Sequence, residues 1–169
     1  MEAPAFITIK TYLSDVQFES PNAPVIFLGN ISNGQAVNKI SFDVQTKANV
    51  DLSMYLIELH TTISPQLVSD GNDVFCLQLT YCSLIQITDK DMDDKSLRKL
   101  LMVDIPQSMY DPLRALVWNI STASGFPGIM MGDFSFAERY SNQLEEGESN
   151  HSIVQDEDSI IPSSHTFCS

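Results

Sequence analysis

The sequence predicts an α+β fold, with a four-stranded antiparallel sheet followed by two C-terminal helices on one face of that sheet. Four segments in the first half of the 169 residues alternate apolar with polar side chains, which is typical of half-buried strands. The second half repeats apolar residues every three or four positions, the spacing of an amphipathic helix. Because the strands precede the helices, the order favours an antiparallel sheet.

The first predicted strand starts at Phe6 and continues past Tyr12, after a bulge near Leu13, into the segment SDVQFESPNAP, residues 14–24. Strand geometry places the polar residues of this segment on one face: Asp15, Gln17 and Glu19. The apolar residues Val16 and Phe18 share the other face. The strand ends at two residues without a backbone donor, Pro21 and Pro24.

Three further strands show the same alternation. The inward-facing residues of the second, between Lys39 and Thr46, are Ile40, Phe42 and Val44. Those of the third are Tyr55, Ile57, Leu59 and Ile63, and those of the fourth are Phe75, Leu77, Leu79 and Tyr81. A turn containing Gly71 joins the last two strands. The loop between the first two contains the apolar run VIFL, residues 25–28, and we expect it to cover or bind something.

The helical half begins with a short helix or turn over Ser96 to Val103. Asp111 is expected to cap the next helix, with Pro112 at its first position and a stop at Gly125 and Pro127. The apolar stripe of this helix is Leu113, Leu116, Val117 and Ile120. The last helix starts near Asp133 or at the capping box Ser135-x-x-Glu138, and its stripe is Phe134 or Phe136 with Ala137, Tyr140 and Leu144.

The net charge of −13 argues against nucleic acid and anionic membranes as partners and favours a basic partner surface. No segment is apolar enough to insert into a membrane and the N-terminus does not resemble a secretion signal, so a cytoplasmic location is expected. Residues 1–145 are predicted to form the folded domain and residues 146–169 a disordered acidic tail. The tail keeps the protein soluble, or it uses its apolar pairs, residues 153–154 and 160–161, as contact points.

The residues give little sign of catalysis or of a cofactor. Asp89, Asp91 and Asp93 have the spacing of a calcium loop, but Asp94 replaces its glycine and Leu100 its bidentate glutamate. The histidines, His60, His151 and His165, do not have the short spacing of a zinc site. The three cysteines, Cys76, Cys82 and Cys168, are expected to be free thiols, and nothing favours a Cys–His pair. The chain is therefore expected to be a binding protein without a cofactor and not an enzyme.

Several segments, taken in order, are similar to those of a known family. The most specific is YLSDVQFESPNAPVIF (residues 12–27), which resembles the opening signature of the SecB family of protein-export chaperones. FDVQT, FCLQLTYCSLIQI, MYDPLRALVWNISTASGFP and DFSFAERY fall where the family has its second and fourth strands and its two helices. The resemblance covers roughly residues 5–145. It implies a homotetramer, built as a dimer of dimers, that binds unfolded precursor polypeptides without ATP and passes them to the motor SecA.

The resemblance also implies two sites. Asp15 and Glu19 match the acids of the SecA-contacting surface, and Cys76 and Gln78 match neighbouring positions, where Gln78 replaces an acid. Candidates for the apolar client-binding groove, each with ordinary core packing as the alternative, are Phe27, Leu28, Phe42, Val44, Phe134, Phe136 and Tyr140. Residues 111–115 depart from the family pattern, which bears on the tetramer contact. Two alternatives remain: a SecB-like holdase for another client, such as a toxin partner, and an acidic interaction domain without SecA coupling.

Overall fold

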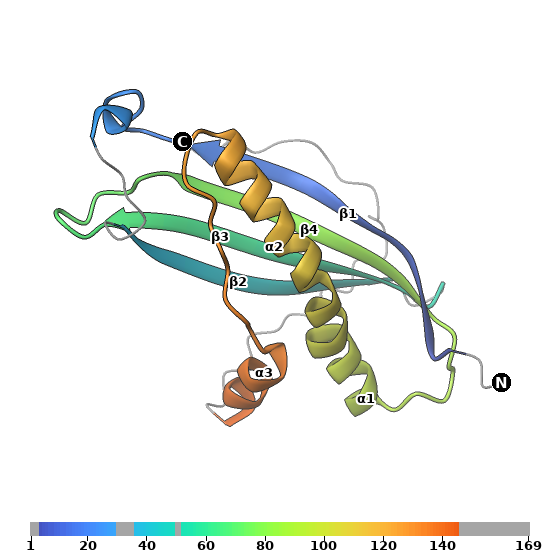
Figure 1. Ribbon diagram of the computed structural model, residues 1–169. Helices are drawn as coiled ribbons and strands as arrows, with labels where there is room; N and C mark the ends of the chain where they lie inside the picture. The colour runs from blue at the N-terminus through green and yellow to red at the C-terminus, as the bar shows by residue number, and fades with distance from the viewer. Residues whose placement is uncertain (1–3, 30–35, 50–51, 146–169) are drawn as a thin grey trace.

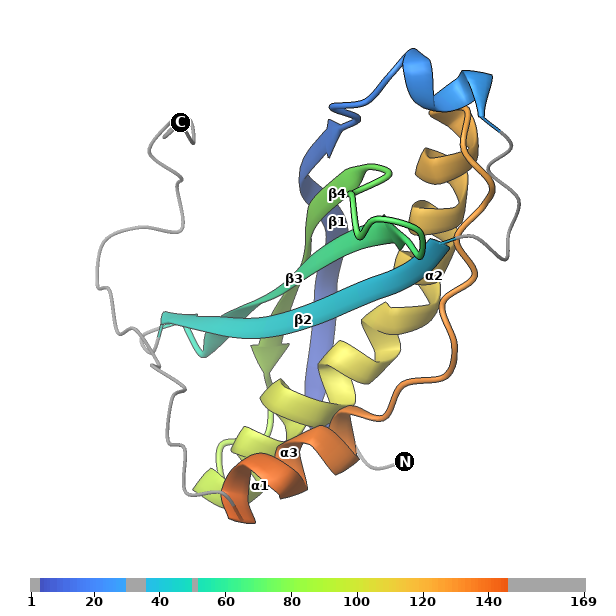
Figure 2. The ribbon, with the colours of Figure 1, turned by 90° about the vertical axis from the view of Figure 1, so that its left-hand side faces the viewer.

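The computed structural model describes residues 4–29, 36–49 and 52–145, and the predicted acidic tail lies outside them. Its four strands are β1 (Phe6–Glu19), β2 (Ala36–Asn49), β3 (Met54–Leu67) and β4 (Cys76–Ile87). They form one antiparallel sheet in the order β1-β4-β3-β2, which leaves β1 and β2 at the edges. The helices lie on one side of this sheet (Figures 1 and 2). The α+β prediction is thus confirmed.

Alternation in the sequence correctly identified the strands and their inner faces. Ile57, Leu59 and Ile63 of β3 and Leu77 of β4 are completely buried, and Val44 of β2 is 6% exposed. The register of β1 against β4 shifts between Leu13 and Asp15, which confirms the predicted bulge, and shifts again between Thr8 and Lys10, which was not predicted. Gly71 has the positive φ of 72° expected of it in the β3–β4 turn.

The helical half forms α1 (Asp94–Lys99), the π-helical η2 (Leu100–Asp104), α2 (Ile105–Ala123) and α3 (Phe136–Glu145), and a 3-10 turn, η1 (Val25–Leu28), follows β1. Figure 2 shows α2 along the sheet, with α1 and α3 together at one end of the molecule. No helix in the described ranges is both long and apolar enough to cross a bilayer.

The predicted start of the main helix at Asp111 was wrong. The helix begins at Ile105, and Pro112 lies inside it. An internal proline removes one backbone hydrogen bond and strains the turn before it. Here the face formed by Met109, Leu113 and Val117 is at most 1% exposed, and burial of this face stabilises the turn despite the proline.

The other helix boundaries agree better with the sequence. Gly125 has a φ of 86° immediately after α2, and the amide of Glu138 donates to Oγ of Ser135 at 3.3 Å at the start of α3. Only part of the predicted α3 stripe is used: Phe136 is buried and Tyr140 is partly buried, but Leu144 remains 66% exposed.

Candidate functional site

An open apolar pocket of about 440 Å³ lies on the helix side of the sheet, where β2 begins. Five parts of the chain enclose it: the start of β2, the end of β3, the residues just before β4, helix α2, and the connection from α2 to α3. Its lining residues are Ala36, Asn38, Pro65, Val74, Phe75, Trp118, Phe126, Pro127, Gly128, Ile129 and Met130. None of these lining side chains is charged, and Asn38 provides the only amide group. Such a pocket suits an apolar group of a ligand.

The wall of this pocket depends on a close approach between Gly128 and Trp118. A Cβ placed on Gly128 would lie 2.6 Å from atoms of the indole ring, so glycine lets the connecting backbone cross the ring directly. Buried Ser121 fixes the same connection to α2, since its Oγ accepts from the amide of Ile129 at 3.1 Å and donates to the carbonyl of Val117 at 2.8 Å. The wall is therefore built into the fold.

A cluster of aromatic rings lies farther along the same strand and the same connection. Phe42 of β2 packs against Phe134 with ring centroids 4.7 Å apart, and Tyr110 and Phe136 complete the cluster. The Tyr110 hydroxyl donates to the carbonyl of Gly132 at 2.6 Å. Phe42 and Phe134 are half-buried, so both retain surface that a ligand can reach. The pocket and this cluster thus mark two points along one path between β2 and the α2–α3 connection.

The residues predicted for the client groove are divided between these places. Phe27 is 46% exposed and packs on Phe126, a pocket residue, with centroids 4.9 Å apart, while Leu28 beside it is 88% exposed. Val44 and Phe136 are 6% and 1% exposed, which leaves them little free surface, and Tyr140 packs against the core from α3.

Sequence reasoning missed the pocket itself, because none of the predicted groove residues lines it. A Trp on a helix and a Gly-containing connection were visible in the sequence. The two residues are ten positions apart, on either side of the end of α2, and their contact was not predictable from that spacing.

The four residues predicted to contact SecA lie together on the opposite, outer face of the sheet. The register pairs Glu19 with Cys76 and Gln17 with Gln78, and Asp15 pairs with Thr80 one step farther along. Directly opposed residues in neighbouring strands share a face. Asp15 and Glu19 are exposed, whereas Phe18 between them faces the core. The alternation of β1 therefore presents the acids to solvent, as predicted.

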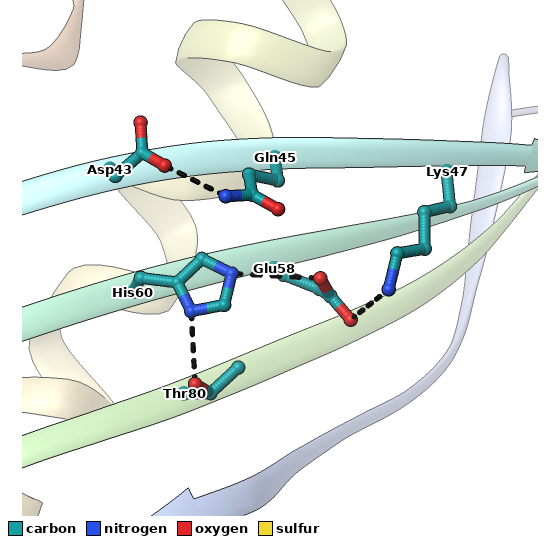
Figure 3. A network of polar contacts seen from close by, with 6 residues as sticks. All are labelled: Asp43, Gln45, Lys47, Glu58, His60 and Thr80. Carbon is teal, nitrogen blue, oxygen red and sulfur yellow. Dashed lines mark hydrogen bonds and ion pairs between the residues drawn. The ribbon is translucent and has the colours of Figure 1, made fainter. Parts of the chain in front are cut away.

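A polar network continues this outer face onto β3 and β2 (Figure 3). Lys47 Nζ is 3.1 Å from Glu58 Oε1, and His60 Nε2 is 3.6 Å from Glu58 Oε2. The imidazole of His60 does most to lower the pKa of the Glu58 carboxyl; partial burial opposes this and the Lys47 ammonium reinforces it, so that the pKa lies below its ordinary value. Glu58 is therefore a fixed negative charge at neutral pH.

The partners of His60 are Thr80 and Glu58, and neither is a cysteine. Both cysteines in the described ranges, Cys76 and Cys82, are free thiols. Burial does most to raise the pKa of Cys82, which keeps it a neutral thiol. No three His, Cys, Asp or Glu residues in these ranges lie together in a group that could hold a metal ion.

Comparison with known proteins finds similar sequences and a similar fold. The family model described as preprotein translocase subunit SecB matches residues 1–147. Similar proteins include the protein-export protein SecB of Anaplasma phagocytophilum, 25% identical over 80% of this chain and 90% of the relative. The SecB of Aromatoleum aromaticum is 29% identical over 83% of this chain and 84% of the relative. A SecB-like chaperone of Mycobacterium tuberculosis, solved with an antitoxin peptide, shares the fold with a TM-score of 0.66, at 14% identity over 78% of this chain and 91% of that one.

Proposed function

Because this chain belongs to the SecB family of protein-export chaperones, we propose that it is an ATP-independent holdase that binds unfolded precursor polypeptides and delivers them to SecA. The observation that carries the proposal is the open, uncharged pocket beside β2. A holdase must bind many sequences, and an apolar pocket recognises side chains by size and hydrophobicity without selecting one sequence.

The client would lie extended between the pocket and the aromatic cluster. Met130 and Trp118, 78% and 44% exposed, form the accessible rim at one end, and the half-buried Phe42 and Phe134 form the other. Phe27 and Leu28 flank the pocket from the η1 turn. In this assignment Val44, Phe136 and Tyr140 support the groove from the core side.

The acidic outer face would be the site where SecA docks. Asp15 and Glu19 face solvent beside Cys76 and Gln78, and a row of exposed acids steers a basic partner by long-range attraction. The two proposed sites lie on opposite faces of one sheet, so the protein could hold a client and a motor at the same time. A cytoplasmic location follows from this role.

We also propose the tetramer of the family, a dimer of dimers. The segment that departs from the family pattern keeps a surface free for such a contact: Leu113 is buried against the sheet, while Asp111, Pro112 and Ala115 point outward from α2. Arg114 Nη1 lies on this surface, 3.4 Å from Oδ1 of Asp133 and 3.7 Å from Oδ1 of Asp111.

A second candidate function is a SecB-like holdase for a client outside export. Two observations favour it: the SecB-like chaperone that shares this fold was solved with an antitoxin peptide, and Gln78 leaves the outer face with one acid fewer than the resemblance implies.

A pull-down of SecA by the full-length chain, with and without a chemically unfolded precursor, separates these readings. Export delivery predicts that SecA is retained in both cases and that precursor and SecA are retained together. Retention of the precursor alone supports the second candidate. Retention of neither contradicts both.

A further inference from the structure

A single row of side chains crosses the outer face of the sheet through all four strands. The register places Asp15 of β1 opposite Thr80 of β4, Thr80 opposite His60 of β3, and His60 opposite Asp43 of β2. With strands about 4.8 Å apart, the row spans about 14 Å. The acidic surface that begins at Asp15 and Glu19 therefore extends across the sheet to Asp43, and a histidine lies within it.

The two ring nitrogens of His60 both face oxygen atoms. Nδ1 is 3.0 Å from Oγ1 of Thr80, and Nε2 is 3.6 Å from Oε2 of Glu58 (Figure 3). Nε2 is buried and has no hydrogen-bond partner at this separation. A neutral imidazole has one N–H and an imidazolium has two, so only the protonated ring can donate to both neighbours. The two oxygen atoms thus lie where both N–H groups of a protonated ring can reach them.

Carboxylates and ammonium groups both occur on this face around His60. They come from three strands: Lys10, Asp15 and Glu19 on β1, Glu58 on β3, and Lys39, Asp43 and Lys47 on β2. Tyr12 and Cys82 also lie on this face, in the row of Glu58, and burial raises the pKa of both groups. The facing residues of β4 in this part of the face, Cys76, Gln78 and Thr80, are uncharged at neutral pH. Four carboxylates and three ammonium groups leave one net negative charge on this face when His60 is neutral, and protonation of His60 cancels it.

We propose that the docking surface for a basic partner extends over Asp43, Glu58 and His60, and that protonation of His60 weakens docking as the pH falls. Imidazole is the side chain whose charge changes between about pH 5 and 8. A new positive charge within about 10 Å of Asp15 acts inside the screening length of physiological salt. It opposes cations of the partner and lowers their rate of association. The inference rests on the proposed docking of SecA at Asp15 and Glu19.

The test compares the dissociation constant of the full-length chain for SecA at pH 7.5 and pH 5.5, for the parent and for His60→Gln. Glutamine keeps a polar side chain that does not titrate in this range. The parent should bind about three- to fivefold more weakly at pH 5.5, as one added charge at an exposed interface allows. For the variant, the dissociation constants at the two pH values should be nearly equal. Any effect of pH on SecA itself weakens binding to the parent and to the variant equally. The double variant His151→Gln/His165→Gln, which keeps His60, should show the same pH dependence as the parent.

A second measurement needs no substitution. Since binding and protonation are linked, saturating SecA should move the NMR titration midpoint of His60 to lower pH, with His151 and His165 as internal references. The inference is overturned if the His60 midpoint does not change when SecA binds. It is also overturned if the ratio of the dissociation constants at pH 5.5 and pH 7.5 is the same for the parent and His60→Gln. Either result leaves the proposed docking at Asp15 and Glu19 intact. If neither protein binds SecA at pH 7.5, the proposed function fails and the inference fails with it.

Discussion

Met130→Glu is expected to weaken the binding of an unfolded precursor about tenfold or more while leaving the fold intact. Met130 lines the pocket but is 78% exposed, so the new side chain displaces no packed atoms in the free protein. When a client fills the pocket, the carboxylate must lose water among side chains that carry no charge. A tenfold loss corresponds to about 1.4 kcal/mol, which is modest for a carboxylate desolvated without a partner.

The matched control for this variant is Leu52→Glu. Leu52 is 55% exposed and follows the far end of β2, about 45 Å along the strand from Ala36. Both variants add one negative charge in place of an exposed apolar side chain, so an effect of net charge appears in both. Binding is followed by fluorescence anisotropy of a labelled, reduced precursor. Equal affinities for the two variants would place client binding outside this pocket.

The second large effect is expected for Asp15→Asn combined with Glu19→Gln, which should weaken SecA binding about tenfold. These substitutions keep the shape of both side chains and remove two charges from the exposed face of β1. Charges at the rim of an interface act mainly on the association rate, so the loss should appear there and shrink at high salt. Client affinity should be unchanged, because the pocket lies on the opposite face of the sheet.

Asp94→Asn combined with Glu138→Gln serves as the control for this double variant. Both residues are exposed, and they lie in α1 and α3 on the helix side of the sheet. The two double variants have the same net charge. A difference between their SecA association rates, measured by surface plasmon resonance, therefore reports only where on the protein the charges were removed. A similar loss of association rate in both would mean that SecA senses the total charge of the chain and has no specific contact with Asp15 and Glu19.

The sheet was predictable because alternation is a local signal with a large energetic consequence. Shifting β1 by one residue would turn Phe18 to solvent and Asp15 toward the core, so the pattern determines which face each residue occupies. Alternation does not decide which strands pair: the position of Cys76 and Gln78 beside Asp15 and Glu19 was implied by the family resemblance, and the register of β1 against β4 comes from the structure.

The start of α2 was misjudged because a local signal was overridden by packing. An Asp-Pro pair is a strong helix-start pattern, and nothing within a few residues of Asp111 argues against it. The deciding interactions are the burial of Met109 on the turn before and of Leu113 on the turn after. These contacts reach the sheet, which lies far away in the sequence.

The pocket was not predictable for a related reason. Its lining comes from five separate parts of the chain, from Ala36 to Met130, and its wall depends on a glycine lying directly against Trp118. The aromatic residues chosen from the sequence were apolar and near the right segments, but which of them stay accessible depends on tertiary packing. Phe136 is buried while Phe134, two residues earlier, is only half-buried.

The claim that this protein is a holdase is tested most directly by light scattering from a precursor that aggregates on dilution from denaturant. The full-length chain, at a few-fold molar excess and without nucleotide, should suppress the scattering, Leu52→Glu should suppress it equally, and Met130→Glu should suppress it less. Full aggregation in the presence of the parent chain, under conditions where circular dichroism shows it folded, would contradict the account.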